Sequence, residues 1–206
     1  MSEQLPDARV LASLLGDQPS SSTDAVAERL HVDADVAERC LAALERDGLV
    51  ERAEGGEWRL PELDPGELRE LYPAVAILET LALRQAPPFD ASTLAALRAA
   101  NADLRAAAGD APAAIAADYD FHDHLTRGCG NPGLLAVLGE IKRALLPFER
   151  AYMLDAERVG RSAAQHDEII AALEAGDNGR ASVLVRENFT SSLPDLASQF
   201  DDDTTP

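Results

Sequence analysis

The chain has 206 residues, and its 18 Lys and Arg against 37 Asp and Glu leave a formal net charge of −19. This charge argues against general affinity for nucleic acid or anionic membranes, both of which are bound through Lys and Arg. Only two cysteines are present, Cys40 and Cys129, in separate predicted helices, which predicts reduced core thiols and no disulfide framework. Apolar content is 46% and dominated by Ala and Leu, which favours an α-rich protein of two domains.

Residues 1–62 are predicted to form a winged helix-turn-helix domain. Apolar residues recur at helical spacing over residues 8–16 and 23–30. Asp35, with Glu38 three residues later, predicts the cap of a third helix that ends before Gly48. Residues 49–60 contain two short extended pieces around a Glu-Gly-Gly turn, which indicates a β-hairpin. Three helices followed by a hairpin is the winged helix-turn-helix order.

The segment from Pro61 to Gly66 contains two prolines and a glycine, and it predicts the domain boundary. From Glu67 onward the pattern is helical, with a kink or break expected at Pro147. Breaks are predicted at 87–88, 109–112, 128–133, near Gly160 and at 176–179. The predicted fold is therefore mainly all-α: the winged domain, an antiparallel helical bundle at 66–199 and a disordered acidic tail at 200–206. With no leader-like start and no apolar run of membrane length, we expect a cytoplasmic protein.

The residues that best suggest chemistry are an acid and a histidine in the predicted bundle. Asp118 and His122 are four residues apart, so their side chains leave one face of a helix one turn apart. This is metal-ligand spacing, although ordinary surface pairs share it. His166 and Asn188 lie on two other predicted helices, and helical bundles build metal sites from inward polar groups of several helices. Carboxylate and imidazole suit Zn, Mn, Fe or Ni, whereas an amide is a poorer ligand.

The remaining histidines are predicted to stay outside this site. His124 is two residues from His122 and should point away from it toward solvent. His31 precedes the third predicted helix and has no partner cluster. The sequence contains no Gly-rich phosphate loop, serine elbow or Cys/His nucleophile pair.

Several stretches, in this order and spacing, resemble the GntR family of bacterial transcription regulators, in its FadR-like branch with a C-terminal ligand-binding FCD domain. They are Glu70-Leu71-Tyr72 with Glu79-Thr80-Leu81-Ala82, Asp118-Tyr119-Asp120-Phe121-His122 leading to Gly130-Asn131-Pro132, and His166-Asp167-Glu168-Ile169-Ile170 leading to Gly176-Asp177. The resemblance covers most of the chain.

This resemblance implies a divalent metal held by one Asp and three His, which helps to bind the carboxylate of a small organic acid inside the bundle. Asp118, His122 and His166 match three of the ligand positions, and Asn188 falls where the family usually has His. Three arginines of the predicted bundle helices could contact the carboxylate, or could equally be surface cations: Arg84, Arg143 and Arg150.

The predicted DNA-reading segment departs from the family. Residues 32–39 read Val-Asp-Ala-Asp-Val-Ala-Glu-Arg, which is acidic where the family carries arginines that meet DNA. Residues 1–62 hold six arginines, no lysine and fourteen acids, a formal charge of −8. Because phosphate contacts rely on cations, this charge weakens the expectation of duplex binding.

Two main functions therefore stay open. The first is a ligand-responsive regulator that binds DNA as a homodimer through four arginines, Arg39, Arg46, Arg52 and Arg59. The second is a metal-dependent enzyme acting on a small molecule, with a winged domain that no longer binds DNA. A sensor that neither catalyses a reaction nor binds DNA is a third alternative.

Overall fold

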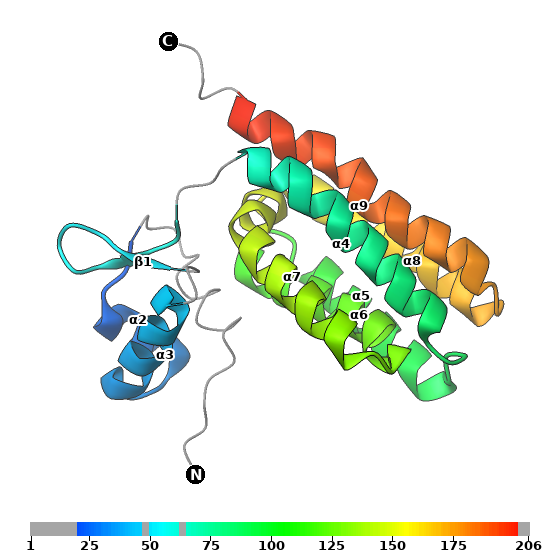
Figure 1. Ribbon diagram of the computed structural model, residues 1–206, viewed down its shortest axis with the longest axis horizontal. Helices are drawn as coiled ribbons and strands as arrows, with labels where there is room; N and C mark the ends of the chain where they lie inside the picture. Colours follow the sequence, from blue (N-terminus) through cyan, green and yellow to red (C-terminus); the bar gives the residue numbers. More distant parts are fainter. Residues whose placement is uncertain (1–19, 47–49, 62–64, 202–206) are drawn as a thin grey trace. The chain divides into compact units, whose positions relative to one another are not determined.

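The structure is a computed structural model that describes residues 20–46, 50–61 and 65–201. The chain divides into two compact units, residues 1–63 and 64–206, and each is described by itself (Figure 1). The described residues are mainly helical, as predicted from the sequence. None of the described helices is long and apolar enough to cross a membrane.

The first unit contains two described helices and a small antiparallel sheet: α2 (Thr23–Leu30), α3 (Ala34–Arg46), β1 (Glu51–Arg52) and β2 (Trp58–Arg59). The predicted helix at 8–16 lies outside the described residues. Ser22 caps α2 by accepting a hydrogen bond from the Ala25 amide at 3.2 Å. Trp58 is fully buried and pairs through its backbone with Ser21, at 2.8 Å in both directions. The hairpin thereby closes over the two helices.

The predicted cap of α3 was wrong by two residues. The helix begins at Ala34, and the Asp33 carbonyl oxygen accepts from the amides of Val36 and Ala37. Glu38, which was predicted to complete the cap, instead accepts a hydrogen bond from the Thr23 hydroxyl at 2.7 Å. That contact across α2 and α3 depends on the tertiary fold, and local spacing does not encode it.

The second unit consists of helices joined by short connections. They are α4 (Pro65–Gln85), α5 (Ala91–Ala106), α6 (Ala111–Thr126), the 3₁₀ helix η1 (Arg127–Cys129), α7 (Pro132–Met153), α8 (Ala156–Glu174) and α9 (Asn178–Asp201). Four of the five predicted breaks fall between these helices. Asp90 and Asp110 cap α5 and α6 by accepting amide hydrogen bonds three residues later.

Two predicted interruptions were wrong. The break expected near Gly160 lies earlier, because Asp155 accepts from the amides of Glu157 and Arg158 and starts α8 at Ala156. A single glycine inside a helix costs only about 1 kcal/mol, which a well-capped and packed helix tolerates. Helix α7 also continues without a break through Pro147.

The helices of the second unit pack as a bundle around a common interior. Helix α4 lies along α9 and also contacts α7, while α8 packs on α5 and α9 (Figure 1). Helix α6 packs on α5 and α7 and also contacts α4. Its buried face therefore meets side chains of several helices, so polar groups on that face can gather inside the bundle.

Candidate metal centre

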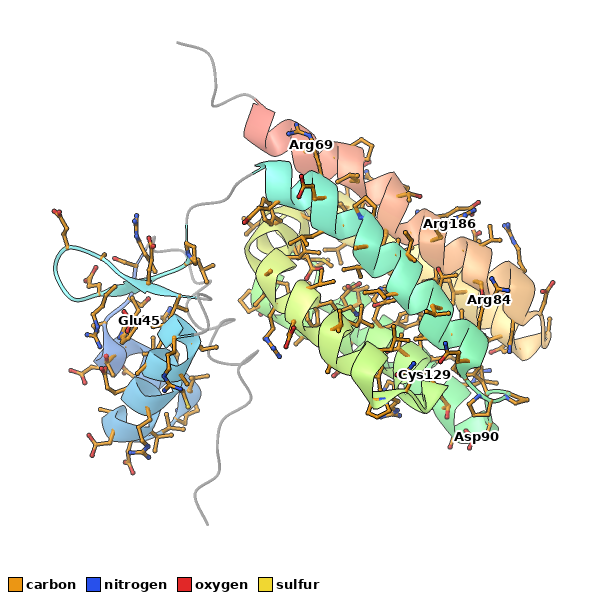
Figure 2. All side chains as sticks on the ribbon, in the orientation of Figure 1. Glu45, Arg69, Arg84, Asp90, Cys129 and Arg186 are labelled. Atoms are coloured by element: carbon orange, nitrogen blue, oxygen red, sulfur yellow. The ribbon has the colours of Figure 1, made fainter. Side chains whose placement is uncertain are left out.

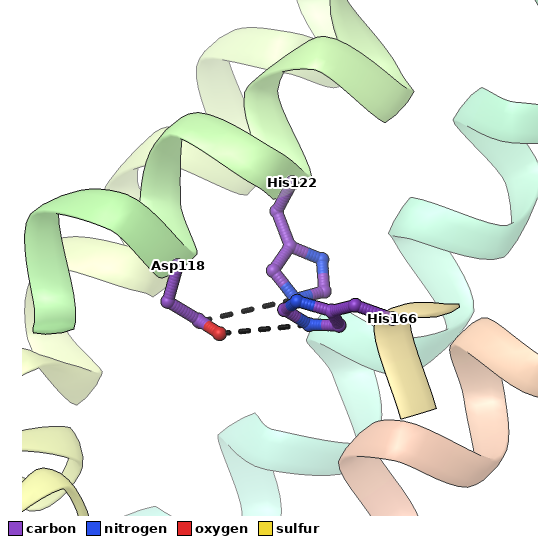
Figure 3. A group of neighbouring side chains, drawn as sticks. All are labelled: Asp118, His122 and His166. Carbon is purple, nitrogen blue, oxygen red and sulfur yellow. Dashed lines mark ion pairs between the residues drawn. The ribbon is translucent and has the colours of Figure 1, made fainter. Parts of the chain in front are cut away.

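Asp118 and His122 from α6 meet His166 from α8 inside the helical unit (Figure 3). One ligand atom from each of the three side chains lies within 4.8 Å of the other two. Asp118 Oδ2 is 3.8 Å from His122 Nε2, and Asp118 Oδ1 is 3.6 Å from His166 Nε2. The i, i+4 spacing on α6 therefore does place both of its side chains on one inward face.

These distances are too long for hydrogen bonds but suit atoms that surround an ion. Hydrogen bonds between such atoms measure about 2.7–3.2 Å. Ligands about 2.1 Å from a tetrahedral ion lie roughly 3.4 Å from each other. The spacing between Asp118 and the two imidazoles is therefore close to that of a metal site.

His166 has the features of a neutral ligand. It is fully buried, and within the described part of the chain neither of its ring nitrogens has a hydrogen-bond partner. Its ring stacks on Phe121 with centroids 3.7 Å apart. Burial holds the pKa of His166 well below its usual range, and the positive charges of Arg105, Lys142 and, when it is protonated, His122 add to this effect. The imidazole therefore keeps a free lone pair at neutral pH.

His122 is oriented by a buried carboxylate from α4. Its Nδ1 lies 2.5 Å from Glu79 Oε2, and Glu79 is 0% exposed. Burial alone raises the pKa of Glu79, but His122 and Lys142 outweigh it and lower that pKa below its usual value. The ionised carboxylate accepts from Nδ1, so Nε2 keeps its lone pair facing Asp118. A carboxylate behind a histidine is a common support for metal-ligating imidazoles.

Glu79 also forms an ion pair with Lys142 of α7. Neither residue was predicted as a site residue, although Glu79 lies in one of the stretches that resemble the GntR family. An acid on the otherwise apolar buried face of α4, together with the only lysine of the chain, was the available signal. Charged side chains are almost never fully buried unless they are paired, so an acid within an apolar helical stripe indicates a buried partner of opposite charge.

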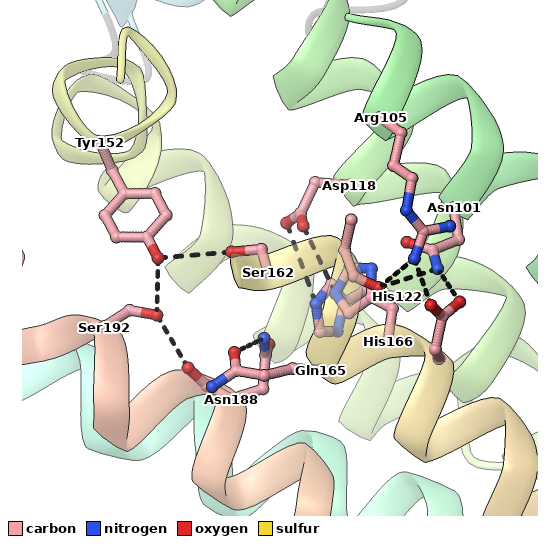
Figure 4. Close-up of polar contacts among 12 residues, drawn as sticks. Asn101, Arg105, Asp118, His122, Tyr152, Ser162, Gln165, His166, Asn188 and Ser192 are labelled. Carbon is pink, nitrogen blue, oxygen red and sulfur yellow. Dashed lines mark hydrogen bonds and ion pairs between the residues drawn. The ribbon is translucent and has the colours of Figure 1, made fainter. Parts of the chain in front are cut away.

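Asn188, the fourth predicted ligand, is buried on α9 but is engaged with a neighbouring side chain. Its Nδ2 donates a hydrogen bond to Gln165 Oε1 at 2.8 Å (Figure 4). Gln165 precedes His166 on α8, so the amide lies close to the cluster in the fold. This hydrogen bond uses only the amide nitrogen of Asn188, so the atom that could act as a metal ligand is its Oδ1.

Asp118 faces a strongly charged interior. Burial raises the pKa of its carboxyl and nearby Glu79 adds to the rise, whereas His122 and Lys142 oppose it. A bound cation would favour the ionised form, since an opposite charge at this distance stabilises the carboxylate. The described residues alone thus hold the acid in an unfavourable environment that a metal ion would relieve.

Of the three arginines expected near the organic acid, two have described side chains, and they differ in burial. Arg84 is exposed, and it lines a surface cleft of 450 Å³ between α4 and α9 together with Arg186 (Figure 2). Arg143 is half-buried, and the side chain of Arg150 lies outside the described residues. For Arg84, the alternative interpretation as a surface cation fits better, because a helix places each side chain by its position around the axis.

Two of the four arginines expected to contact DNA are engaged within the winged unit. Arg52 pairs with Glu38 at 2.5 Å and lies 4.0 Å from the Trp58 ring centroid. Arg59 pairs with Glu51, also at 2.5 Å. Arg39 and Arg46, on α3, are exposed.

The two histidines predicted to lie outside the site differ in burial. His31 is exposed and ends α2 in a left-handed conformation with a φ of 54°. His124 is half-buried, and its Nδ1 has no hydrogen-bond partner among the described residues. The prediction that His124 faces solvent was therefore too simple, because it ignored the segment around Pro87 and Pro88 that lines the same small cavity.

The FCD domain family matches residues 70–191, which include every member of the cluster. This chain belongs to the FCD-domain family. No curated protein sequence matches it. The FCD domain spans α4 to α9, so the proposed metal ligands and their supporting residues all lie within it.

Solved structures show the same fold over nearly the whole chain. McbR/YncC from E. coli has a TM-score of 0.71 at 18% identity, covering 94% of this chain and 95% of that one. A GntR transcriptional regulator from Rhodococcus sp. RHA1 has a TM-score of 0.71 at 17% identity, covering 93% of each chain. The Listeria monocytogenes protein Lar has a TM-score of 0.57 at 18% identity, covering 95% and 96%. The resemblance to GntR-type regulators with an FCD domain is confirmed, and so is the predicted fold class.

Proposed function

We propose that this FCD-domain protein is a ligand-responsive transcription regulator in which a divalent metal, held by Asp118, His122 and His166, helps to bind a small organic acid. The observation that carries the proposal is the buried cluster itself, in which His166 presents unpartnered ring nitrogens and His122 is held by Glu79. Zn, Mn, Fe and Ni all accept this ligand set. When bound, the metal would act as a Lewis acid that attracts a carboxylate.

DNA binding by the winged unit is compatible with its ion pairs. Both partners of the Arg52–Glu38 and Arg59–Glu51 pairs are about two-fifths exposed. Exposed ion pairs contribute about 0–1 kcal/mol, so a phosphate can replace the acid at little cost. With Arg39 and Arg46 already exposed, all four arginines are available to a duplex in an acidic unit.

The metal is tested on the purified full chain by elemental analysis. We expect about one divalent ion per chain in the wild type, and near-complete loss in Asp118→Ala and His166→Ala. His124→Ala, outside the cluster, is the matched control and should keep its metal. A wild-type chain that binds none of Zn, Mn, Fe or Ni when they are supplied would overturn the site, provided that circular dichroism shows it folded.

DNA binding is tested separately by a gel shift on the promoter of the protein's own gene, at several salt concentrations. We expect a shift that weakens steeply as salt rises, because phosphate contacts release counterions. Absence of any shift at low salt, with metal present, would remove the regulator function while leaving the metal site intact.

A homodimer and a cytoplasmic location belong to the same proposal. Helix-turn-helix readers bind DNA mostly as dimers whose half-sites follow the protein symmetry. Light scattering on the purified protein should give twice the chain mass of 21.9 kDa. A monomer at micromolar concentration, with or without DNA, would contradict the dimer.

A metal-dependent enzyme is the second candidate, favoured by one observation. Asp118, His122 and His166 are three strong ligands, whereas Asn188 offers only a neutral amide oxygen, and three protein ligands with an open position are typical of catalytic metal sites. A metal-loaded protein that fails to bind DNA yet consumes a small acid would favour this alternative. Unchanged acid recovered after prolonged incubation would count against it.

A further inference from the structure

A third acid, Glu149 of α7, lies in the bundle interior, where it is neither a proposed metal ligand nor a partner in the Glu79–Lys142 ion pair. Lys142 and Glu149 are seven residues apart on α7, which is two helical turns, so they share one face. They are only 9% and 8% exposed. Both therefore point into the bundle, where charged groups are costly unless paired.

Lys142 already has partners. Its ammonium pairs with Glu79 and lies 5.4 Å from the ring centroid of Tyr119. Glu79 in turn holds His122. The lysine therefore belongs to the support of the metal ligands, and no ion pair among the described residues involves Glu149.

Glu149 is incompletely satisfied. Its Oε2 is buried and has no hydrogen-bond partner among the described residues. The Tyr119 hydroxyl lies within hydrogen-bonding range of Glu149. Its single proton, however, is donated to the Lys142 carbonyl oxygen at 2.8 Å. An unpartnered buried polar atom costs about 1–3 kcal/mol, and more when charged, so it points to a missing donor.

Glu149 and the metal cluster share one interior. Burial raises the pKa of Glu149 to about 7, and the nearby negative charge of Asp118 contributes, with Lys142 and His122 opposing. The buried Tyr72 hydroxyl of α4 feels both Glu149 and Asp118, which raise its pKa together with burial. Tyr119, a hydrogen-bonding neighbour of Glu149, directly follows Asp118 on α6, so Glu149 lies beside the cluster.

The charges of this interior favour a ligand without net charge. Three carboxylates, Glu79, Asp118 and Glu149, face one ammonium, that of Lys142. When all four are ionised, these four side chains leave two negative charges, which a divalent metal would neutralise. The nearby Arg105 is half-exposed and is paired with Asp167. A plain carboxylic acid would then add an uncompensated charge, whereas a zwitterion would add none.

We propose that the ligand of this domain is a small amino acid, whose carboxylate faces the metal while its ammonium group donates to Glu149 Oε2. This inference rests on the proposed metal-assisted binding of an organic acid and narrows its chemical class. It assigns Glu149 a specificity role in addition to the metal ligands.

The proposal is tested with two matched sets of small molecules on the metal-loaded full chain. The two sets differ in the distance between the carboxylate and the amino group, which is short in the first and longer in the second. The first set is propionate, lactate and alanine. The second is butyrate, 4-hydroxybutyrate and 4-aminobutyrate. Affinity is measured by isothermal titration calorimetry on the wild type and on Glu149→Gln, with the exposed Glu140→Gln of α7 as control.

We expect at least one amino compound to bind the wild type about 10-fold or more tightly than its unsubstituted partner, since hydrogen bonds to charged groups contribute about 1.5–3 kcal/mol. Glu149→Gln should reduce that preference to within about threefold, and Glu140→Gln should keep it. The wild-type comparison stands even if Glu149→Gln does not fold.

Equal binding of amino and unsubstituted acids by the wild type would overturn the inference but leave the proposed function intact. A preference that persists in folded, metal-loaded Glu149→Gln would overturn the role of Glu149. If no acid of either set binds the metal-loaded wild type, both the inference and the organic-acid part of the proposed function fail, while the metal and DNA assays keep their own results.

Discussion

Both units of this chain contain ion pairs, but those of the winged unit are exposed to solvent, whereas the Glu79–Lys142 pair of the FCD domain is buried. In the winged unit, Arg52–Glu38 and Arg59–Glu51 are surface pairs whose side chains are about two-fifths exposed. In the FCD domain, Glu79 is 0% exposed and binds both His122 and Lys142. Surface pairs in water are weak and exchangeable, whereas a buried network cannot lose one member without leaving an uncompensated charge.

The net charge of a unit therefore says less about what it can bind than the burial of its ion pairs does. The winged unit has more acids than arginines, yet Arg52 and Arg59 are held only by weak surface ion pairs that a phosphate can replace. In the FCD interior, by contrast, Glu79, His122 and Lys142 hold one another in place.

Replacing Glu79 with Gln should have the largest effect. The amide has one acceptor oxygen and no charge, whereas Glu79 serves two donors, the Lys142 ammonium and His122 Nδ1, so we expect a loss of about 3–5 kcal/mol in the free energy of unfolding. Metal affinity should fall about 10- to 100-fold, as for other changes behind metal-ligating histidines. Chemical denaturation and competition with a metal-binding dye measure the two effects.

The control for that prediction is the double variant Glu79→Gln, Lys142→Met. Removing both charges should recover most of the lost stability, because a buried ion pair replaced by neutral groups is often nearly neutral. Metal affinity should stay low, since His122 still lacks its carboxylate. Equal stability of the single variant and the wild type would contradict the buried network.

An intermediate effect is expected from the exposed arginines of α3. Arg39→Ala should weaken duplex binding roughly eightfold at 0.1 M salt and lower the slope of log affinity against log salt by about 0.9. Arg46→Ala should act similarly. Arg180→Ala, exposed on α9 of the FCD domain, should leave binding unchanged. An unchanged salt slope in both α3 variants would exclude them from the DNA contact.

A smaller change, in the opposite direction, is expected from Glu38→Gln. The substitution frees Arg52 and removes one negative charge beside the proposed DNA surface, so duplex affinity should rise by about two- to eightfold. The amide oxygen can still accept from Thr23, so the fold is kept. The same gel shift measures the effect, and weaker binding in a folded variant would show that Glu38 positions Arg52 for DNA.

The smallest effect concerns stability in the winged unit. Arg59→Ala removes a surface pair and should lower the free energy of unfolding by less than about 1 kcal/mol. Denaturation of the full chain, monitored by the fluorescence of Trp58, its only tryptophan, measures this directly. A loss comparable to that of Glu79→Gln would erase the contrast between the two units.

Much of the fold follows from local sequence, because helix ends depend on neighbouring residues. The prolines at 87 and 88, the aspartates at 90 and 110 and the glycine at 176 mark ends that the structure retains. The break predicted near Gly160 does not occur, because Asp155 caps the helix more strongly than one glycine weakens it. At Pro147 a kink or a break was predicted, and no break occurs, because α7 continues through the proline as a single helix.

The candidate site divides along the same line. The i, i+4 spacing was enough to place Asp118 and His122 on one face, since four residues make about one helical turn, and the family resemblance marked His166 as a further ligand. The packing of the helices brought His166 of α8 to these two residues and placed Glu79 behind His122. The same packing buried Glu149 Oε2 where no described residue offers it a hydrogen bond. It also engaged Asn188 with Gln165. Those contacts depend on how helices distant in sequence pack together, and no local spacing encodes them.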